Sequence, residues 1–361
     1  MAPTSASAQL IARRTDFQAA LHGWYRTNQR KLPWRASPSL YKTVVSEFML
    51  QQTQVATVLP YFDRWLRELS DFAALAAAPE TKVMKLWEGL GYYSRARNLH
   101  KLAQAVVAMP APPRTPAAWR ELPGIGPYTS AAITSIAFGE PAACVDGNVV
   151  RILARLTGET KRFATGVDAA RHFTPLADAL IVGASAGDHN QAMMELGATV
   201  CFRAKPLCLT CPVAEFCAAR RAGNQDSLPR FAPKQIEQKS VIRTFILDRG
   251  RLLLRRGSAD AKRLAGVHEL PEAHDLGVKP AADALLATKR RTITRFQITE
   301  QIYAVKLDTA LRKRIAVADG TLEWVARDEL DRITLSGPHK RWIAELLQGS
   351  TPQIRQPHEQ D

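Results

Sequence analysis

Four of the five cysteines in this 361-residue chain lie in one loop, and this feature most constrains the fold. Their spacing is Cys201-x6-Cys208-x2-Cys211-x5-Cys217. Four thiolates on a short loop form two disulfides, a zinc site or an iron–sulfur cluster. Disulfides suit small secreted domains, and we expect no secretory signal peptide at this N-terminus. Zinc ribbons usually pair two Cys-x2-Cys knuckles, and only one occurs here. The spacing predicts a metal centre and leaves zinc and iron open.

The charge of the chain indicates a class of partner. Lysine and arginine total 49 against 34 aspartate and glutamate, which gives a net charge of +15 and a pI near 9.9. Such a surplus favours a polyanion, because neutralised phosphates release counterions on binding. A basic, solvated surface fits the charge equally well. No apolar run approaches the roughly 18 residues of a membrane helix, so we expect no membrane partner.

Hydrophobic periodicity predicts two regions. From residue 16 to 222 apolar residues recur at helical spacing, interrupted by turn-rich segments. The polar segment 223–240 lacks periodicity and predicts a linker. Beyond it, β-rich residues around Asp248-Arg249-Gly250 predict a hairpin, and 337–347 predict a helix. We expect a mainly α N-terminal region and a small α+β domain over 241–348, with a flexible N-terminus over 1–15 and a disordered tail over 349–361.

A glycine-rich turn lies between two helical stretches, in Leu122-Pro-Gly-Ile-Gly-Pro-Tyr-Thr129. Gly124 and Gly126 would let the backbone approach a ligand closely, and the following helix would offer free N–H groups. Such a hairpin between helices grips a DNA phosphate without reading sequence. An ordinary turn between two helices fits the same residues.

Asp146 precedes a helical pattern in which Val149, Ile152, Leu153 and Leu156 form one apolar face. An N-cap, worth about 1 kcal/mol, accounts for this position. The same geometry would also keep a carboxylate ionised and facing a developing cation.

Taken together, the hairpin, the aspartate and the cysteine loop resemble the endonuclease III superfamily of helix-hairpin-helix DNA glycosylases. In detail the chain is similar to MutY-type adenine DNA glycosylases, over about residues 16–220. The matching strings are Leu32-Pro-Trp-Arg35, Ser46-Glu-Phe-Met-Leu-Gln-Gln-Thr-Gln-Val55, Trp87-Glu-Gly-Leu-Gly-Tyr-Tyr93 with 95–100, and Asn190-Gln-Ala-Met-Met-Glu-Leu-Gly197.

The resemblance implies a catalytic set. Glu47 would protonate the adenine, because burial on an apolar helix raises a carboxyl pKa towards neutrality. A lone glutamate in that pattern would otherwise be a solvated surface residue. Asp146, ionised, would stabilise an oxocarbenium ion electrostatically or through a transient covalent adduct, and the two carboxyl groups would form the split pair of N-glycoside hydrolysis. Tyr128 and Asn148 would orient them.

The same resemblance implies DNA contacts. Gln52 and Tyr92 would wedge into the base stack near the orphaned guanine with Leu50 beside them, whereas core packing fits Tyr93. The expected DNA-binding set is Arg35, Leu50, Gln51, Gln52, Tyr92, Gly124, Gly126, Thr294 and Arg295.

Two further implications concern mechanism and cofactor. Related bifunctional enzymes carry a lysine at the position of Tyr128, and tyrosine cannot form a Schiff base efficiently, so we expect a monofunctional enzyme. The resemblance favours one [4Fe–4S] cluster on the four cysteines, in a structural role that places Arg203 and Lys205 near phosphate. Cys144, outside the loop, would be a small buried hydrophobe.

The C-terminal domain of MutY-type enzymes is Nudix-like and senses 8-oxoguanine. Residues 264–272 resemble the segment before a Nudix box, but the box itself is absent, so nucleotide-diphosphate hydrolysis is not expected. The lesion-reading loop, usually Phe-Ser-His, is Ile293-Thr294-Arg295 here.

The sequence therefore predicts a monomeric, cytoplasmic, nucleoid-associated adenine DNA glycosylase of base excision repair. Its partner would be double-stranded DNA with A:8-oxoguanine or A:G mispairs. An endonuclease III-like pyrimidine glycosylase/lyase and a non-catalytic iron–sulfur DNA-binding protein are the alternatives.

Overall fold

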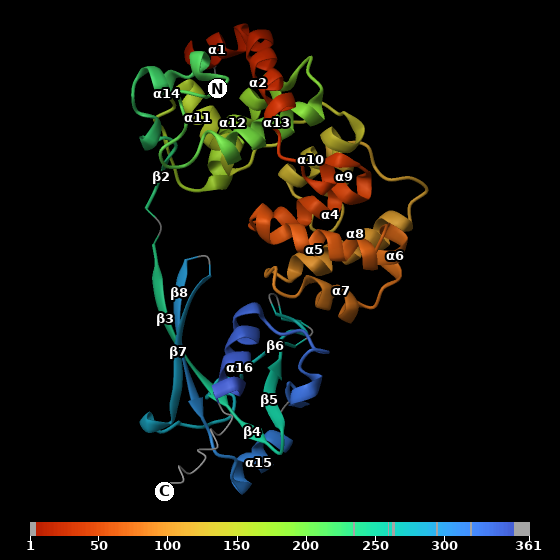
Figure 1. The fold of residues 1–361 in the computed structure, drawn as a ribbon, viewed down its shortest axis with the longest axis vertical. Coiled ribbons are helices and arrows are strands. Elements are labelled where there is room, and N and C mark those ends of the chain that lie inside the picture. Colours follow the sequence, from red (N-terminus) through yellow and green to blue (C-terminus); the bar gives the residue numbers. More distant parts are fainter. Residues whose placement is uncertain are drawn as a thin grey trace, which may run out of the picture. The chain divides into compact units, whose positions relative to one another are not determined.

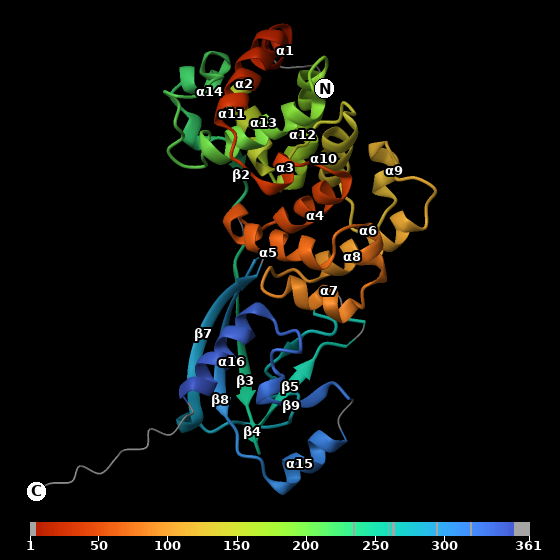
Figure 2. The same cartoon turned by 45° about the vertical axis from the view of Figure 1, so that its right-hand side comes forward.

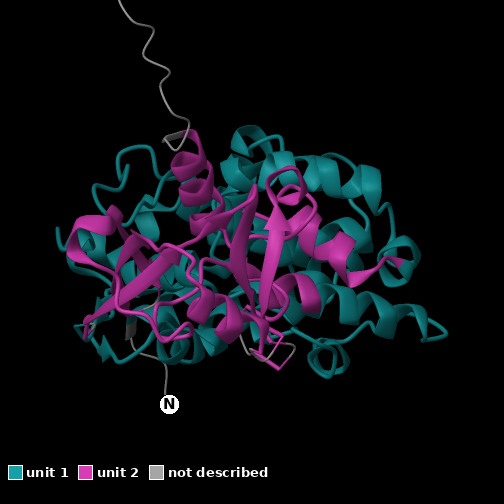
Figure 3. Cartoon of the chain, turned by 90° about the horizontal axis from the view of Figure 1, so that it is seen from below, with its two compact units in different colours: residues 1–77, 98–233 teal, residues 78–97, 234–361 magenta. Residues whose placement is uncertain are grey.

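In the computed structural model the chain forms two compact units, which Figure 3 colours separately. Unit 1 comprises Met1–Ala77 and Asn98–Pro233, and unit 2 comprises Ala78–Arg97 and Lys234–Asp361. The structure describes residues 5–233, 235–258, 260–261, 264–293, 295–317 and 320–349. No helix within these ranges is long and apolar enough to cross a bilayer.

Unit 1 is helical. Its main helices are α1 (Ser5–Ala12), α2 (Arg14–Asn28), α3 (Pro33–Ala36), α4 (Leu40–Leu50), α5 (Val55–Glu68), α6 (Phe72–Ala77), α8 (Ser94–Val107, whose first turn belongs to unit 2), α9 (Pro116–Arg120), α10 (Pro127–Phe138), α11 (Gly147–Thr157), α12 (Gly166–Ile181), α13 (Ala186–Thr199) and α14 (Ala218–Arg221). Short elements complete it: η1 (Ala214–Phe216), η2 (Gln225–Ser227) and the parallel pair β1 (Arg162–Phe163) and β2 (Arg230–Phe231).

Local sequence accounts for the helix ends that matter here. Ser39 caps α4 by accepting a hydrogen bond from the backbone N–H of Lys42 at 3.2 Å. Helices α10 and α11 each end at a glycine in the left-handed region, Gly139 and Gly158. The expected glycine-rich turn lies between α9 and α10, as predicted.

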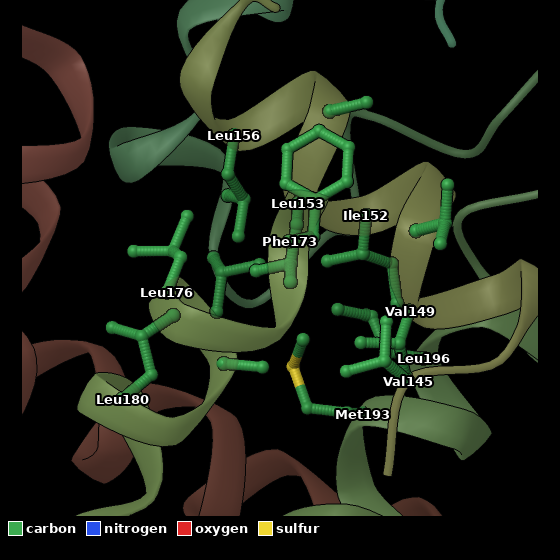
Figure 4. Packing of buried hydrophobic residues seen from close by; sticks show 14 of the residues in the cluster. Val145, Val149, Ile152, Leu153, Leu156, Phe173, Leu176, Leu180, Met193 and Leu196 are labelled. Carbon is green, nitrogen blue, oxygen red and sulfur yellow. The ribbon is translucent and has the colours of Figure 1, made fainter. Parts of the chain in front are cut away.

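The core of unit 1 is formed by α11, α12 and α13 together with the N-terminal helices. Figure 4 shows Leu153 of α11, Phe173 of α12 and Met193 of α13 turned towards one another. Leu10 of α1 joins this cluster and is 4% exposed. The structure therefore places a packed helix within the N-terminal residues that we expected to be flexible, because Leu10 has a core to enter.

Unit 2 contains two sheets in the part of the chain that the structure describes. One is β3 (Glu237–Phe245), β8 (Phe296–Ala304) and β7 (Leu285–Ile293), in that order. In it β3 runs parallel to β8, and β7 and β8 form an antiparallel hairpin (Figures 1 and 2). The other consists of β4 (Leu247–Asp248), β5 (Arg251–Arg256) and β6 (His268–Glu269), with β9 (Leu322–Ala326) paired to β5.

Helices cover these sheets. Trp342 and Ile343 of α16 (Gly337–Gly349) pack on Phe245 and Ile302, while α15 (Thr309–Ala316) packs on a second cluster around β5. Two short turns, η3 (Ala282–Ala284) and η4 (Arg327–Glu329), complete the unit. The predicted mainly α region and smaller α+β region are confirmed, as is the hairpin, formed by β4 and β5.

Two features differ from the expected domain limits. The segment 223–240 holds η2, β2 and the start of β3 in place of an unstructured linker. Residues 78–97, with α7 (Glu80–Trp87), group with the C-terminal residues although the sequence placed them in the helical domain. Most of the expected tail, 350–361, lies outside the described residues.

Candidate active site

A cavity of about 960 Å³ opens in unit 1 and gathers the predicted catalytic residues. Its size is in the range of ligand pockets. The walls come from α2, α3, α4, α5, α10, α11 and α13. Predicted site residues in the lining are Arg35, Glu47, Leu50, Tyr128, Asp146 and Asn148.

Glu47 is the most buried carboxyl group of the cavity. Helix α4 is buried almost all round, from Tyr41 to Met49, and Glu47 itself is 7% exposed. Its Oε2 atom has no hydrogen-bond partner among the residues that the structure describes. Burial, aided by the Asp146 charge, raises the pKa of Glu47 to about 7 against the opposing effects of Tyr128 and Arg35. The group can therefore be protonated near neutral pH, which a general acid needs.

Asp146 caps helix α11, as its position in the sequence predicts. Its Oδ1 accepts hydrogen bonds from the backbone N–H groups of Asn148 at 2.9 Å and Val149 at 2.8 Å. Its Oδ2 accepts from the side chain of Asn148 at 3.0 Å. Burial is the largest influence and raises the pKa of Asp146, whereas these bonds and Arg151 lower it. The sequence suggested that the helix cap would keep Asp146 ionised. In the structure the cap does not lower the pKa of Asp146 below its usual value, because burial of the carboxyl group at the cavity outweighs the hydrogen bonds.

Tyr128 and Asn148 stand beside the two carboxyl groups. The Tyr128 hydroxyl donates to Met194 Sδ at 3.0 Å, and burial, followed by the Glu47 charge, raises the pKa of Tyr128 far above its usual range. It stays a neutral phenol. Asn148 is held in turn, because Arg151 donates to its Oδ1 at 2.8 Å.

Gly197 explains why α13 can approach Asn148 so closely. A Cβ atom at Gly197 would lie 2.5 Å from Asn148 Cβ, far inside van der Waals contact. Arg151 bonds the Gly197 carbonyl at 2.9 Å and the Cys201 carbonyl at 2.8 Å. Arg151 was not predicted from the sequence, although its place one turn after Asn148 on an amphipathic helix was a usable signal.

Arg35, one of the expected DNA contacts, takes part in an ion pair beside the cavity. It lines the cavity and donates to the Glu195 carboxylate at 3.0 Å. Arg30 completes this buried ion pair with Nε at 2.7 Å. Burial opposes ionisation of Glu195, but the two guanidinium groups prevail and lower its pKa. Glu195 was missed because a mid-helix glutamate gives no sign of its partners.

Asn190 is a third residue that was not predicted, and it has a clear structural task. Its side chain donates to Ser135 Oγ and to the Ala142 carbonyl, both at 2.8 Å, and accepts from the Cys144 N–H at 2.9 Å. These bonds fix the segment that leads into Asp146. Cys144 is buried, as predicted.

The predicted DNA-contacting turns have unusual backbones. Gln52 and Tyr92 have positive φ angles of 54° and 48°, a region that non-glycine residues rarely occupy. Gln51 donates to Thr129 Oγ1 at 3.3 Å. Gly124 has φ of 76°, and a Cβ there would meet Asn98 Cβ at 2.6 Å, so the turn requires glycine. Gly126 caps α10 with open space beside it.

In unit 2 the predicted lesion-reading loop lies at the tip of the β7–β8 hairpin. Ile293 ends β7, and Thr294 lies outside the described residues. Arg295 is exposed, forms an ion pair with Glu237 at 2.8 Å and lies over the Phe296 ring at 5.1 Å.

The four loop cysteines are unpaired and half-buried. Arg155 donates to Cys201 Sγ at 3.2 Å, and the Arg220 N–H donates to Cys217 Sγ at 3.4 Å. Burial, together with the charges of the other three thiols, raises the pKa of the Cys211 thiol to about 11. Among the described residues, no three His, Cys, Asp or Glu side chains are arranged to hold a metal ion. The fit to a metal cluster rests on the donor set: four neighbouring free thiols with N–H groups aimed at sulfur.

Comparisons with known proteins agree with this site. Residues 45–174 match the family model described as HhH-GPD superfamily base excision DNA repair protein. Adenine DNA glycosylase from Homo sapiens is 43% identical over 234 residues, which cover 60% of this chain and 42% of that protein. The enzyme of that name from Schizosaccharomyces pombe is 38% identical, over 58% of this chain and 50% of its own. The chain thus spans about half the length of these curated relatives.

A solved structure shares the helical fold. The structure of a thermostable thymine-DNA glycosylase matches 58% of this chain and 98% of its own, with 27% identity and a TM-score of 0.51.

Proposed function

We propose that the chain is a monofunctional adenine DNA glycosylase of the HhH-GPD superfamily of base excision DNA repair proteins, in its MutY-type branch. Its substrate would be adenine mispaired with 8-oxoguanine or guanine in duplex DNA. One observation carries the proposal: Glu47, with a pKa of about 7, shares a cavity with Asp146. Relatives named adenine DNA glycosylase support the choice of base.

The reaction would begin with adenine extruded from the duplex into the cavity. Protonated Glu47 donates its proton to the purine ring, the glycosidic bond breaks, and its electron pair leaves with the neutral base. The sugar becomes an oxocarbenium ion, which the Asp146 carboxylate stabilises. Water adds to the cation at C1′ and gives its proton to the Glu47 carboxylate, which restores the acid and leaves an abasic site.

Neighbouring residues would set the two ionisation states. The Asn148 amide bonds Asp146 Oδ2 at 3.0 Å, so Asp146 keeps one orientation as charge develops. Tyr128 is a neutral phenol beside Glu47. Because it has no amine, it cannot form the Schiff base of a lyase, and strand cleavage should be negligible.

We also propose that Cys201, Cys208, Cys211 and Cys217 hold one [4Fe–4S] cluster. The free thiols and the N–H donors at sulfur support this. The cluster would have a structural role, since hydrolysis transfers no electrons. Residues 241–348 would form the Nudix-like domain that reads the lesion, with Thr294 and Arg295 as its DNA contacts. We also propose action as a monomer and a cytoplasmic location, nucleoid-associated if the source is bacterial.

The deciding experiment is single-turnover cleavage of duplexes carrying A:8-oxoguanine, A:G, A:T, T:G or thymine glycol, each with and without alkali. We expect adenine release from the first two and strand breaks only after alkali. Thymine release from T:G would assign the chain to the specificity named for its structural neighbour. Strand cleavage of thymine glycol without alkali would indicate the lyase alternative, and binding with no excision of any base would indicate a non-catalytic DNA-binding protein.

A further inference from the structure

The turn after helix α7 presents one tyrosine in a strained backbone. Gly89 and Gly91 have φ angles of 105° and 71°, and Tyr92 follows with φ of 48°. A bulky residue in the left-handed region is strained and persists only when its surroundings over-determine it. Tyr92 is nevertheless 48% exposed. The contacts that hold the Tyr92 backbone must therefore be made by the residues on either side of Tyr92 in the chain.

Arg95 holds the turn from inside. Its Nη2 donates to the carbonyls of Leu90 at 3.0 Å and Gly91 at 3.1 Å. Its guanidinium lies over the rings of Trp87 at 5.2 Å and Tyr92 at 5.5 Å. Trp87 adds an Nε1 hydrogen bond to the Gly91 carbonyl at 3.1 Å. The backbone before Tyr92 and one face of its ring are thus fixed locally.

Two side chains that flank the turn reach a single residue of the C-terminal segment. Glu88 Oε1 accepts from the backbone N–H of Leu335 at 2.8 Å, and the Tyr93 hydroxyl donates to the Leu335 carbonyl at 2.7 Å. Glu88, Tyr93 and Leu335 are all buried. Both backbone groups of Leu335 are therefore satisfied by side chains on either side of Tyr92. We call this arrangement the Leu335 clamp.

Charged contacts reinforce the clamp. Lys85 and Lys340 both bind Glu88 Oε2, the former at 2.9 Å. Burial opposes ionisation of Glu88, but these lysines and the Leu335 N–H prevail and lower its pKa. Lys85 also donates to the Ile333 carbonyl at 2.7 Å. A buried carboxylate with this many partners is expensive to detach, so the turn and residues 333–340 hold together as one body.

Leu335 is itself immobile. It is 3% exposed and belongs to the core that α16 forms with the sheets of unit 2, through Trp342 and Ile302. A second contact lies on the C-terminal side of the turn, where Arg97 donates to the Ala265 carbonyl. The turn is thus fastened to the C-terminal residues at both of its ends.

We propose that Glu88 and Tyr93 are positioning residues, which use the Leu335 clamp to hold Tyr92 in its strained, exposed conformation for insertion into the base stack. The C-terminal region of unit 2 then sets the shape of the DNA wedge in addition to any contact its own loop makes with the lesion. This inference rests on the proposed function, because it takes Tyr92 as a DNA-contacting residue. It gives the tyrosine pair two separate tasks: Tyr92 contacts DNA, and Tyr93 holds the clamp.

The test is a set of conservative variants assayed on full-length protein. Tyr93→Phe removes one hydroxyl and leaves the ring in the core. Loss of one buried hydrogen bond should lower single-turnover excision from A:8-oxoguanine by about tenfold at most. If Tyr93 acts through Tyr92, then Tyr93→Phe should have no further effect in a Tyr92→Ala background. A 2-aminopurine next to the orphaned 8-oxoguanine should also brighten less when Tyr93→Phe binds, because the wedge no longer unstacks it.

The matched control is Tyr41→Phe. The Tyr41 hydroxyl also donates to a buried leucine carbonyl, that of Leu69, at 2.7 Å, but Tyr41 belongs to unit 1 and has no part in the clamp. Tyr41→Phe should lower thermal stability as Tyr93→Phe does, without changing excision or 2-aminopurine fluorescence. Glu88→Gln, which keeps the shape and removes the charge, should reproduce the Tyr93→Phe signature.

Three results would overturn the clamp: Tyr93→Phe and Glu88→Gln both matching the wild type, losses that add to that of Tyr92→Ala, or the same fluorescence change in Tyr41→Phe. Failure of the proposed function would look different, since the wild type would then release adenine from no duplex. In that case the fluorescence experiment on bound duplex still decides whether Tyr93 controls insertion of Tyr92.

Discussion

Glu47→Gln should make the protein more stable at alkaline pH while abolishing excision. The pKa of Glu47 rises from an ordinary value of 4.5 to about 7 in the folded protein, chiefly through burial. In this pH interval the folded state binds more protons than the unfolded state, so stability falls as pH rises. The loss begins near the unfolded pKa and levels off above the folded one. A glutamine at this position does not titrate and escapes the loss.

The magnitude follows from the same shift. Each unit of pKa is worth about 1.4 kcal/mol, so the full penalty is about 3 kcal/mol, as an upper value. Part of this loss of stability is already present at pH 5. The advantage of Glu47→Gln over the wild type should therefore grow by about 2 kcal/mol between pH 5 and pH 8.5. Comparing two pH values removes any fixed cost of the buried amide, so the difference isolates the titration of Glu47.

The assay is urea unfolding followed by tryptophan fluorescence across that pH range. Glu195→Gln is the matched control, because Glu195 is fully buried in the same unit but has a lowered pKa. The stability that the ionised Glu195 carboxylate contributes is complete above the pKa of Glu195 in the unfolded chain. It is lost only as pH falls through the lower pKa of Glu195 in the folded protein. Removing it should cost about 3–5 kcal/mol at every pH from 5 to 8.5, with no slope. Parallel pH profiles for Glu47→Gln and the wild type would refute the raised pKa.

Three further predictions concern rate, packing and metal. The single-turnover rate should fall about tenfold per pH unit above pH 7 as Glu47 loses its proton, and a flat profile to pH 9 would exclude it as the acid. Gly197→Ala should displace Asn148 and slow excision about tenfold with iron retained, whereas a rate equal to that of Gly166→Ala, where a Cβ meets open space, would contradict that role of Gly197. Cys208→Ser should lose the brown chromophore and its iron, while Cys144→Ser keeps both; an iron-free, fully active wild type would remove the cluster from the proposal.

The burial of Glu47 and the helix cap of Asp146, the proposed catalytic pair, were predictable because their signals are local. The apolar pattern around Glu47 implies burial, and burial alone supplies most of its pKa shift. Asp146 stands one residue before an amphipathic helix, and the structure gives it the cap that this position implies. Helix α11 itself begins where the pattern begins. Such features depend on a dozen consecutive residues, which a single sequence displays.

Long-range partners were not predictable. Arg35 matched a family string but pairs with Glu195, which is distant in the chain. Residues 78–97 read as part of the helical region, yet Glu88 and Tyr93 bond Leu335. Nothing in the local pattern of either segment specifies the other, because a hydrogen bond to a backbone group places no demand on the identity of the residue that supplies it.

Helix α11 connects the proposed catalytic aspartate to the cysteine loop. At its start the Asp146 carboxylate bonds Asn148, and one turn later Arg151 bonds both Asn148 and the Cys201 carbonyl. A further turn on, Arg155 bonds Cys201 Sγ. A loop that lost its metal would release Cys201 and, through Arg151, the partner that orients Asn148. A cluster with no part in bond cleavage can then still govern the rate, so Cys208→Ser should slow excision from bound duplex as well as weaken binding. Full excision by the iron-free variant at saturating DNA would show that α11 holds Asp146 unaided.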